Sequence, residues 1–141
     1  MDNLKPVKIR DASTLEELLK YIFLSSSNKI LNCYKELKYG YDKESLHQYR
    51  VSIRRFKSFI NFFKNEINSN ERIVINNIIK MLLDPTSKAR DFDVITEEYI
   101  SPSSNSHPGD NEFSSLENQS KKIQTELHSN TLNQLSSSNY L

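Results

Sequence analysis

The chain has 141 residues, enough for one domain with a modest core. Its 2 glycines and 4 prolines are too few turn formers for a β-sandwich or β-barrel, and its single cysteine excludes an internal disulfide and argues against a cysteine-bound metal. The net charge of +1 conceals an asymmetry, because residues 1–95 carry 17 basic and 12 acidic side chains (+5), whereas residues 96–141 carry 2 and 6 (−4), so an anionic partner is expected on the first two thirds.

Residues 1–12 are predicted to be an irregular lead-in. They are polar and do not resemble a signal peptide, and the longest apolar run, residues 21–24, is too short to span a bilayer. We therefore expect a soluble, cytoplasmic protein that does not act in a membrane.

A helical core is predicted over residues 13–100. Ser13 and Glu16 have the spacing of a capping box, and the apolar residues behind them keep helical spacing up to Gly40, a typical C-terminal stop. Asp42 can then cap a second helix that runs to about residue 66.

A third helix, capped by Ser69 or Asn70, must end before Pro85, because proline disfavours helix at the residue that precedes it. Thr86 can cap a fourth helix over residues 87–100. Two helices joined by so short a link are expected to turn sharply on one another.

The remaining chain is more polar. Residues 101–112 are rich in Ser, Asn, Pro and Gly and are predicted to be a linker, residues 113–135 a last helix with a thin apolar stripe, and residues 136–141 a frayed tail. The expected fold is an all-α bundle of four to five helices.

The second predicted helix separates its side chains into two sides at roughly 100° per residue. One side is apolar: Tyr49, Ile53, Phe56, Ile60, Phe63 and Ile67. The other is basic: His47, Arg50, Arg54, Lys57 and Asn61, with Arg55 at its flank. Like charges at this spacing repel one another, so an anionic ligand is the expected reason for them.

A phosphate chain fits this pattern chemically. Arginine presents a planar fork that matches two phosphate oxygens, and lysine adds a point charge. A second apolar strip on the same helix, Val51, Phe59 and Phe62, indicates packing on two sides, so that the basic stripe would face a groove.

Two segments resemble a known family. Residues 46–57 read LHQYRVSIRRFK and residues 88–94 read KARDFDV. In this order and at this separation they resemble the two hallmarks of the CHAD family, the conserved histidine α-helical domain. The resemblance covers roughly residues 13–100 and extends, more weakly, to the predicted last helix.

The resemblance implies an all-α fold of four-helix units that binds inorganic polyphosphate without catalysis, cofactor or metal. Carried over residue by residue, the polyphosphate contacts are His47, Arg50, Arg54, Arg55, Lys57 and Arg90. Asp91 and Asp93 are expected to cap the fourth helix or to pair with the arginines.

One departure from the family matters. Its members usually contain two helical halves, each with a basic helix, whereas no arginine follows Arg90 here. The chain therefore resembles the N-terminal half of a two-bundle CHAD-like architecture. A homodimer could supply the missing half; the alternative is a degenerate member that binds weakly.

Three other functions stay open. A nucleic-acid-binding module could use the same stripe, although neither a helix-turn-helix nor exposed stacking aromatics are expected. A protein-interaction module could use the strip of Val51, Phe59 and Phe62. A phosphohydrolase is least expected, because only Asp91 and Asp93 could hold Mg²⁺ and they point in different directions on a helix.

Overall fold

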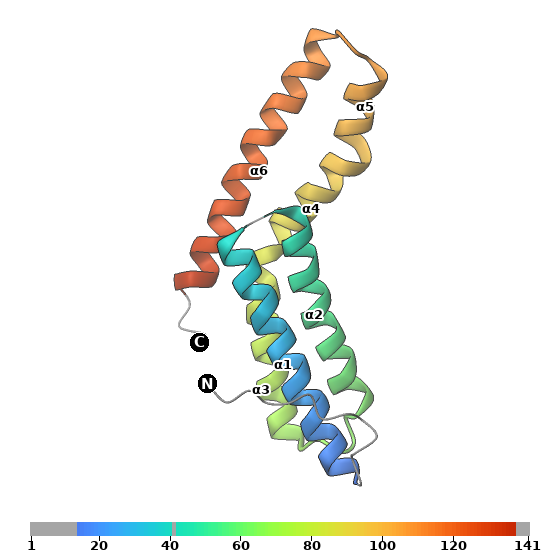
Figure 1. Ribbon diagram of the computed structural model, residues 1–141, viewed down its shortest axis with the longest axis vertical. Helices are drawn as coiled ribbons and strands as arrows, with labels where there is room; N and C mark the ends of the chain where they lie inside the picture. The colour runs from blue at the N-terminus through green and yellow to red at the C-terminus, as the bar shows by residue number, and fades with distance from the viewer. Residues whose placement is uncertain (1–13, 41, 138–141) are drawn as a thin grey trace.

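The computed structural model describes residues 14–40 and 42–137, and every regular element within them is helical (Figure 1). The elements are α1 (Leu15–Tyr39), α2 (Lys43–Phe62), α3 (Ser69–Leu83), the 3₁₀ turn η2 (Asp84–Thr86), α4 (Ser87–Ile95), the π-helical segment η3 (Thr96–Ile100), α5 (Ser101–Ser106) and α6 (Asn111–Ser137). The predicted all-α bundle is confirmed. None of these described helices is long and apolar enough to cross a membrane.

The helices form two parts (Figure 1). In the three-helix part, α1, α2 and α3 lie side by side with alternating directions. From α3 the chain continues in the same direction through η2, α4, η3 and α5, and α6 then returns beside them, forming the hairpin part. The last turns of α6 reach the level at which α1 ends and α2 begins.

Side-chain caps define the starts of α1 and α2. Thr14 is the N-cap of α1, and its hydroxyl accepts a hydrogen bond from the backbone N–H of Glu17 (3.2 Å). The predicted capping box begins at Ser13, which lies outside the described residues. The predicted cap of α2 is confirmed: Asp42 accepts from the N–H of Ser45 (2.6 Å), and the Ser45 hydroxyl accepts from the N–H of Asp42 (3.0 Å).

The junction at Pro85 differs from the prediction of a sharp turn. The flanking residues keep right-handed helical backbone angles, and the chain passes from α3 into α4 without reversing. Pro85 sits in the first turn of η2, where proline is tolerated. Thr86 does not cap α4 with its side chain; its hydroxyl instead donates to the carbonyl oxygen of Leu83 (2.6 Å), and the Pro85 carbonyl accepts from Thr131 of α6 (3.2 Å).

The segment predicted to be a linker is partly helical. Its first six residues form α5, and the non-helical connection is confined to residues 107–110, where Gly109 has φ +87°. The Ser104 hydroxyl donates to the Glu117 carboxylate of α6 (2.9 Å). The helical extension is therefore stabilised by contact with α6, which no local sequence pattern reveals.

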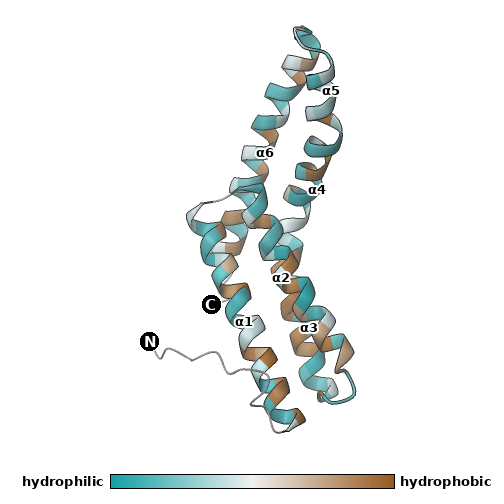
Figure 2. Ribbon diagram, turned by 45° about the vertical axis from the view of Figure 1, so that its right-hand side comes forward, coloured by the Kyte–Doolittle hydropathy of each residue, from teal (hydrophilic) through white to brown (hydrophobic). Residues whose placement is uncertain are grey.

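The core is concentrated on α2 and its neighbours, where brown ribbon gathers in the three-helix part (Figure 2). The buried apolar side chains are Cys33, Leu37, Leu46, Tyr49, Ile53, Phe56, Ile60, Ile79, Ala89 and Leu135. The apolar side predicted for α2 is confirmed for Tyr49, Ile53, Phe56 and Ile60. Leu135 of α6 belongs to this cluster, so the last helix packs on the bundle.

Candidate functional site

The basic side of α2 starts where the two parts of the molecule meet and continues along the three-helix part. The apolar side of α2 packs on α1, and its first half also contacts α4. On a helix with about 3.6 residues per turn, Arg50, Arg54 and Lys57 follow one another along one side. The structure gives these three residues very different surroundings.

Arg50 is a buried cross-link, with only 9% of its surface exposed. Its Nη1 donates to the buried hydroxyl of Thr86 in η2. The same nitrogen lies 3.4 Å from the carbonyl oxygen of Leu83 and 3.4 Å from the hydroxyl of Ser87. Arg50 therefore joins α2 to the junction between α3 and α4, and it helps to keep that junction helical.

Arg54 and Lys57 are exposed on the next two turns of α2. Within the described part of the chain, neither forms an ion pair with a carboxylate. Their charges are therefore available to a ligand. His47, one turn before Arg50, is half-buried. Arg55 is exposed, but it lies about 100° around the helix axis from Arg54, so it flanks the basic side without belonging to it.

Residues 88–94, the second sequence motif, lie near Arg50 of the first motif in the folded chain. Burial is the main reason why the pKa of Arg50 is lowered. The positive charges of Arg54 and Arg90 lower this pKa further, whereas the carboxylate of Asp91 raises it. Arg90 is half-buried on α4, and its Nη1 lies 3.9 Å from a carboxylate oxygen of Glu97. The site therefore concentrates positive charge from α2 and α4 around Arg50.

Asp93 does not have the role expected for it. It does not cap α4, and it pairs with no arginine among the described residues. Asp93 is fully buried, and its Oδ1 accepts a hydrogen bond from Gln124 (2.8 Å) and pairs with His128 (3.0 Å), both on α6. Asp93 therefore holds α6 on α4. Asp91, two residues earlier, is exposed, so the two carboxylates do point in different directions as the helix predicts.

Sequence reasoning missed two features around the site. Lys43, in the first turn of α2, pairs with Glu97 of η3 (2.6 Å) and so helps to fix the hairpin part on α2. A polar groove between α2 and α3 is lined by Lys57 and by Lys80, which is exposed on α3. Neither contact has a local signal, because each depends on how separate helices are placed.

The described residues include no group of three or more His, Cys, Asp or Glu side chains placed to hold a metal ion. Oδ1 of Asp93 bonds Gln124 and His128 of α6, whereas its buried Oδ2 has no hydrogen-bond partner among the described residues. The site presents guanidinium and ammonium groups, which interact with a ligand through charge and hydrogen bonds.

Comparisons with known proteins place the chain in a family. Neither the curated proteins nor the solved structures give a match. The CHAD domain family matches residues 23–141, a stretch that includes both basic motifs and continues through α6. Since the match covers most of its length, this chain belongs to the CHAD domain family, which is known to bind polyphosphate.

Proposed function

We propose that this protein binds inorganic polyphosphate without catalysing a reaction. The observation that carries the proposal is the pair of exposed cations, Arg54 and Lys57, which follow the buried Arg50 along α2. Arg54 can hold two phosphate oxygens with its planar fork, and Lys57 adds a charge one turn further on. Membership of a polyphosphate-binding family supports this ligand over other polyanions.

The candidate contacts divide by their surroundings. Arg54 and Lys57 are proposed to touch the phosphates directly, with His47 and Arg55 at the two margins. Arg50 and Arg90 are proposed to contribute mainly positive potential, because the first is buried and the second lies near Glu97. The basic side chains repel one another in the free protein, and a bound anion reduces this repulsion. The reduced repulsion favours binding.

The decisive experiment is binding of long-chain polyphosphate across a salt series, with DNA of matched charge as the control. We expect binding that weakens steeply with salt, because each phosphate that is neutralised releases a counterion. Replacing both Arg54 and Lys57 by alanine should weaken binding roughly tenfold. The matched control replaces Lys29 and Lys35, two exposed lysines of α1, and should change affinity less than about twofold.

The outcomes separate the candidate functions. Preference for polyphosphate over DNA supports the proposal, whereas equal affinity would make the protein a general polyanion binder. Absence of polyphosphate binding by a folded protein would refute the proposal. The absence of catalysis is tested in the same samples, because release of orthophosphate in the presence of Mg²⁺ would contradict it.

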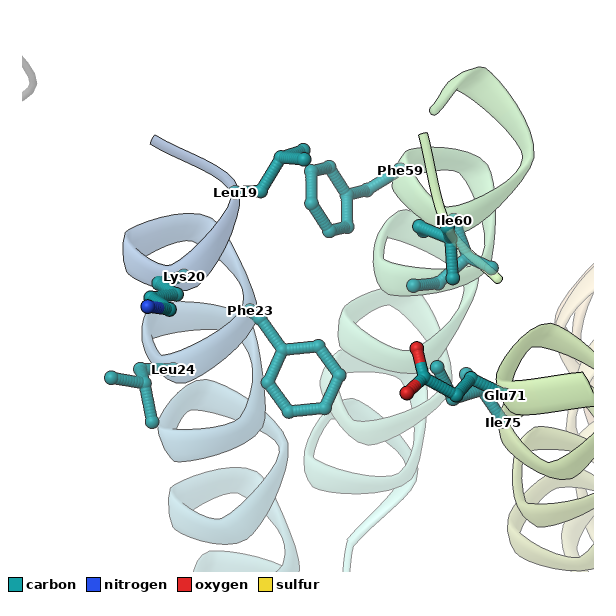
Figure 3. A pocket seen from close by; sticks show the side chains of 9 residues that line it. Leu19, Lys20, Phe23, Leu24, Phe59, Ile60, Glu71 and Ile75 are labelled. Atoms are coloured by element: carbon teal, nitrogen blue, oxygen red, sulfur yellow. The ribbon is translucent and has the colours of Figure 1, made fainter. Parts of the chain in front are cut away.

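A homodimer is proposed as the assembly, on the evidence of an apolar groove among the described helices. A groove of about 360 Å³ between α1, α2 and α3 is lined mostly by apolar side chains, including Phe23 and Phe59 (Figure 3). Lys20, which already pairs with Glu16 (2.8 Å), lies at one rim and Glu71 at the other, so a two-fold axis can bring Lys20 of one copy near Glu71 of the other. Sedimentation of the protein with and without polyphosphate tests this assembly; a strict monomer in both conditions would refute it.

A protein-interaction function is the second candidate. Phe62, one residue of the second apolar strip of α2, is 80% exposed, and α3 exposes Ile73, Val74, Ile78 and Met81. An apolar surface of this kind often marks a protein contact. Tight binding of a protein partner by a chain that ignores polyphosphate would favour this candidate over the first.

A further inference from the structure

The groove between α2 and α3 is lined by lysine and asparagine side chains together with apolar ones and one carboxylate. It measures about 470 Å³, within the range of small-ligand pockets. Its described lining residues are Lys57, Asn61, Asn76, Asn77, Ile79, Lys80, Leu83 and Asp84. The two lysines come from opposite walls, and three carboxamides lie with them. No aromatic side chain is among these lining residues, so the groove offers no surface on which a nucleic-acid base could stack.

The groove continues the basic side of α2. Lys57 belongs to both, and Arg54 is exposed one turn before it. At the other wall, Leu83 lines the groove and its carbonyl oxygen lies 3.4 Å from Nη1 of Arg50. The groove therefore begins beside the buried arginine and runs along the seam between α2 and α3.

Some polar groups that line the groove have no partner among the described residues. The side-chain oxygen of Asn76 is buried and has no hydrogen-bond partner among the described residues. Lys57 and Lys80 form no ion pair within the described part of the chain. Ammonium groups and carboxamide N–H groups are donors that suit phosphoryl oxygens. The unpaired oxygen of Asn76 is an acceptor, so it needs a donor such as water and does not itself bind an anion.

We propose that this groove is a second subsite for the polyphosphate chain, in which Lys80 and the asparagines of α3 hold phosphoryl groups adjacent to those bound by Arg54 and Lys57. This inference rests on the proposed function and extends it from one helix to two. Asp84 lies at the end of the groove and opposes an anion there. The charge of Asp84 therefore limits the affinity of this subsite.

Two substitutions of opposite effect test the subsite. Lys80→Gln should weaken binding of long-chain polyphosphate by about two- to fivefold, and Asp84→Asn should strengthen it by a similar factor. Lys122→Gln is the matched control, because Lys122 is exposed on α6 away from the groove and its loss changes the net charge equally. Thermal melting of each variant checks that folding is unchanged.

The results distinguish this inference from the proposed function. If wild-type protein binds and Arg54→Gln weakens binding, but Lys80→Gln behaves like Lys122→Gln and Asp84→Asn has no effect, the groove is not a subsite and the inference is wrong. If wild-type protein does not bind polyphosphate at all, the proposed function fails and the subsite fails with it. Opposite shifts for Lys80→Gln and Asp84→Asn support the inference, because a loss of stability would not produce them.

Discussion

The three-helix part and the hairpin part bury different kinds of side chain. The ribbon is more hydrophobic in the three-helix part and more hydrophilic in the hairpin part (Figure 2). In the three-helix part the buried residues are mostly apolar: Cys33, Leu37, Leu46, Tyr49, Ile53, Phe56, Ile60 and Ile79. In the hairpin part they are mostly polar: Asp93, Thr96, Ser120 and Thr131, with Ala89 and Leu135. The three-helix part is thus stabilised by apolar burial. In the hairpin part, hydrogen bonds of Asp93 and Thr131 join its elements, whereas Oδ2 of Asp93 and the hydroxyl of Thr96 are buried without a partner among the described residues. The candidate site lies at their boundary, where Arg50 joins them.

The largest effect is expected from Ile53→Ala in the three-helix part. Ile53 is fully buried on α2, so its truncation should lower the free energy of unfolding by about 2–5 kcal/mol. Chemical denaturation measures this loss. The matched control is Ile73→Ala, because Ile73 is 58% exposed on α3 and should change stability by less than about 0.5 kcal/mol. Equal losses for the two variants would contradict the assigned core.

Asp93→Ala tests the hairpin part and should have the next largest effect. Its removal leaves Gln124 and His128 without their shared partner, at a cost of about 2–3 kcal/mol. Hydrogen exchange should rise first in α6, while the amides of α2 stay protected. Asp91→Ala, an exposed neighbour on α4, is the control and should leave α6 protected. A uniform rise over both parts would show that they unfold as one unit.

The difference between the two parts also explains which structural features can be predicted from the sequence. The period of α2 predicts the burial of Tyr49, Ile53, Phe56 and Ile60, because apolar burial follows from the face of a single helix. The same period places Arg50 among the basic residues, although its hydrogen-bond acceptors come from η2 and neighbouring residues more than thirty positions away in the chain. The sequence of one helix does not show which hydrogen-bond acceptors another segment will place beside it.

The hairpin part was harder to predict for the same reason. The rule that proline ends a helix is local, whereas the hydrogen bond from Thr131 to the carbonyl of Pro85 joins residues 46 positions apart. The pairing of Asp93 with His128 spans 35 positions and has no periodic signal. Lys80 was missed because the groove exists only when α3 is placed against α2. Apolar periodicity can be read locally, but polar pairing depends on the assembled fold.

A third prediction separates stability from binding at the boundary. Arg50→Ala should destabilise the protein by about 1–2 kcal/mol, because the buried hydroxyl of Thr86 loses its donor, and it should also weaken polyphosphate binding. Arg54→Gln should leave the melting temperature nearly unchanged and weaken binding by about fivefold. Thermal melting and a binding titration measure both quantities. If Arg50→Ala and Arg54→Gln lowered stability and binding in the same proportion, this result would contradict the separate roles of the two residues.

The smallest effect at neutral pH is expected from Tyr49→Phe, which probes a polar atom inside the apolar part. The hydroxyl of Tyr49 is buried and has no hydrogen-bond partner among the described residues. Its removal should therefore change the free energy of unfolding by less than about 1 kcal/mol, in the stabilising direction. Chemical denaturation at pH 7 measures the difference.

The same side chain should matter more at alkaline pH. Burial, with a smaller contribution from Tyr34, raises the pKa of Tyr49 above its ordinary value of 10.0. Above that pH the unfolded chain releases the phenolic proton while the folded chain keeps it, so stability should fall as pH rises, by at most about 1.4 kcal/mol per pH unit. Tyr49→Phe should remove this part of the slope, whereas Tyr39→Phe should not, because Tyr39 is 87% exposed. Identical alkaline slopes for wild type and Tyr49→Phe would show that water reaches the hydroxyl and that the apolar part is less tightly closed than its burial indicates.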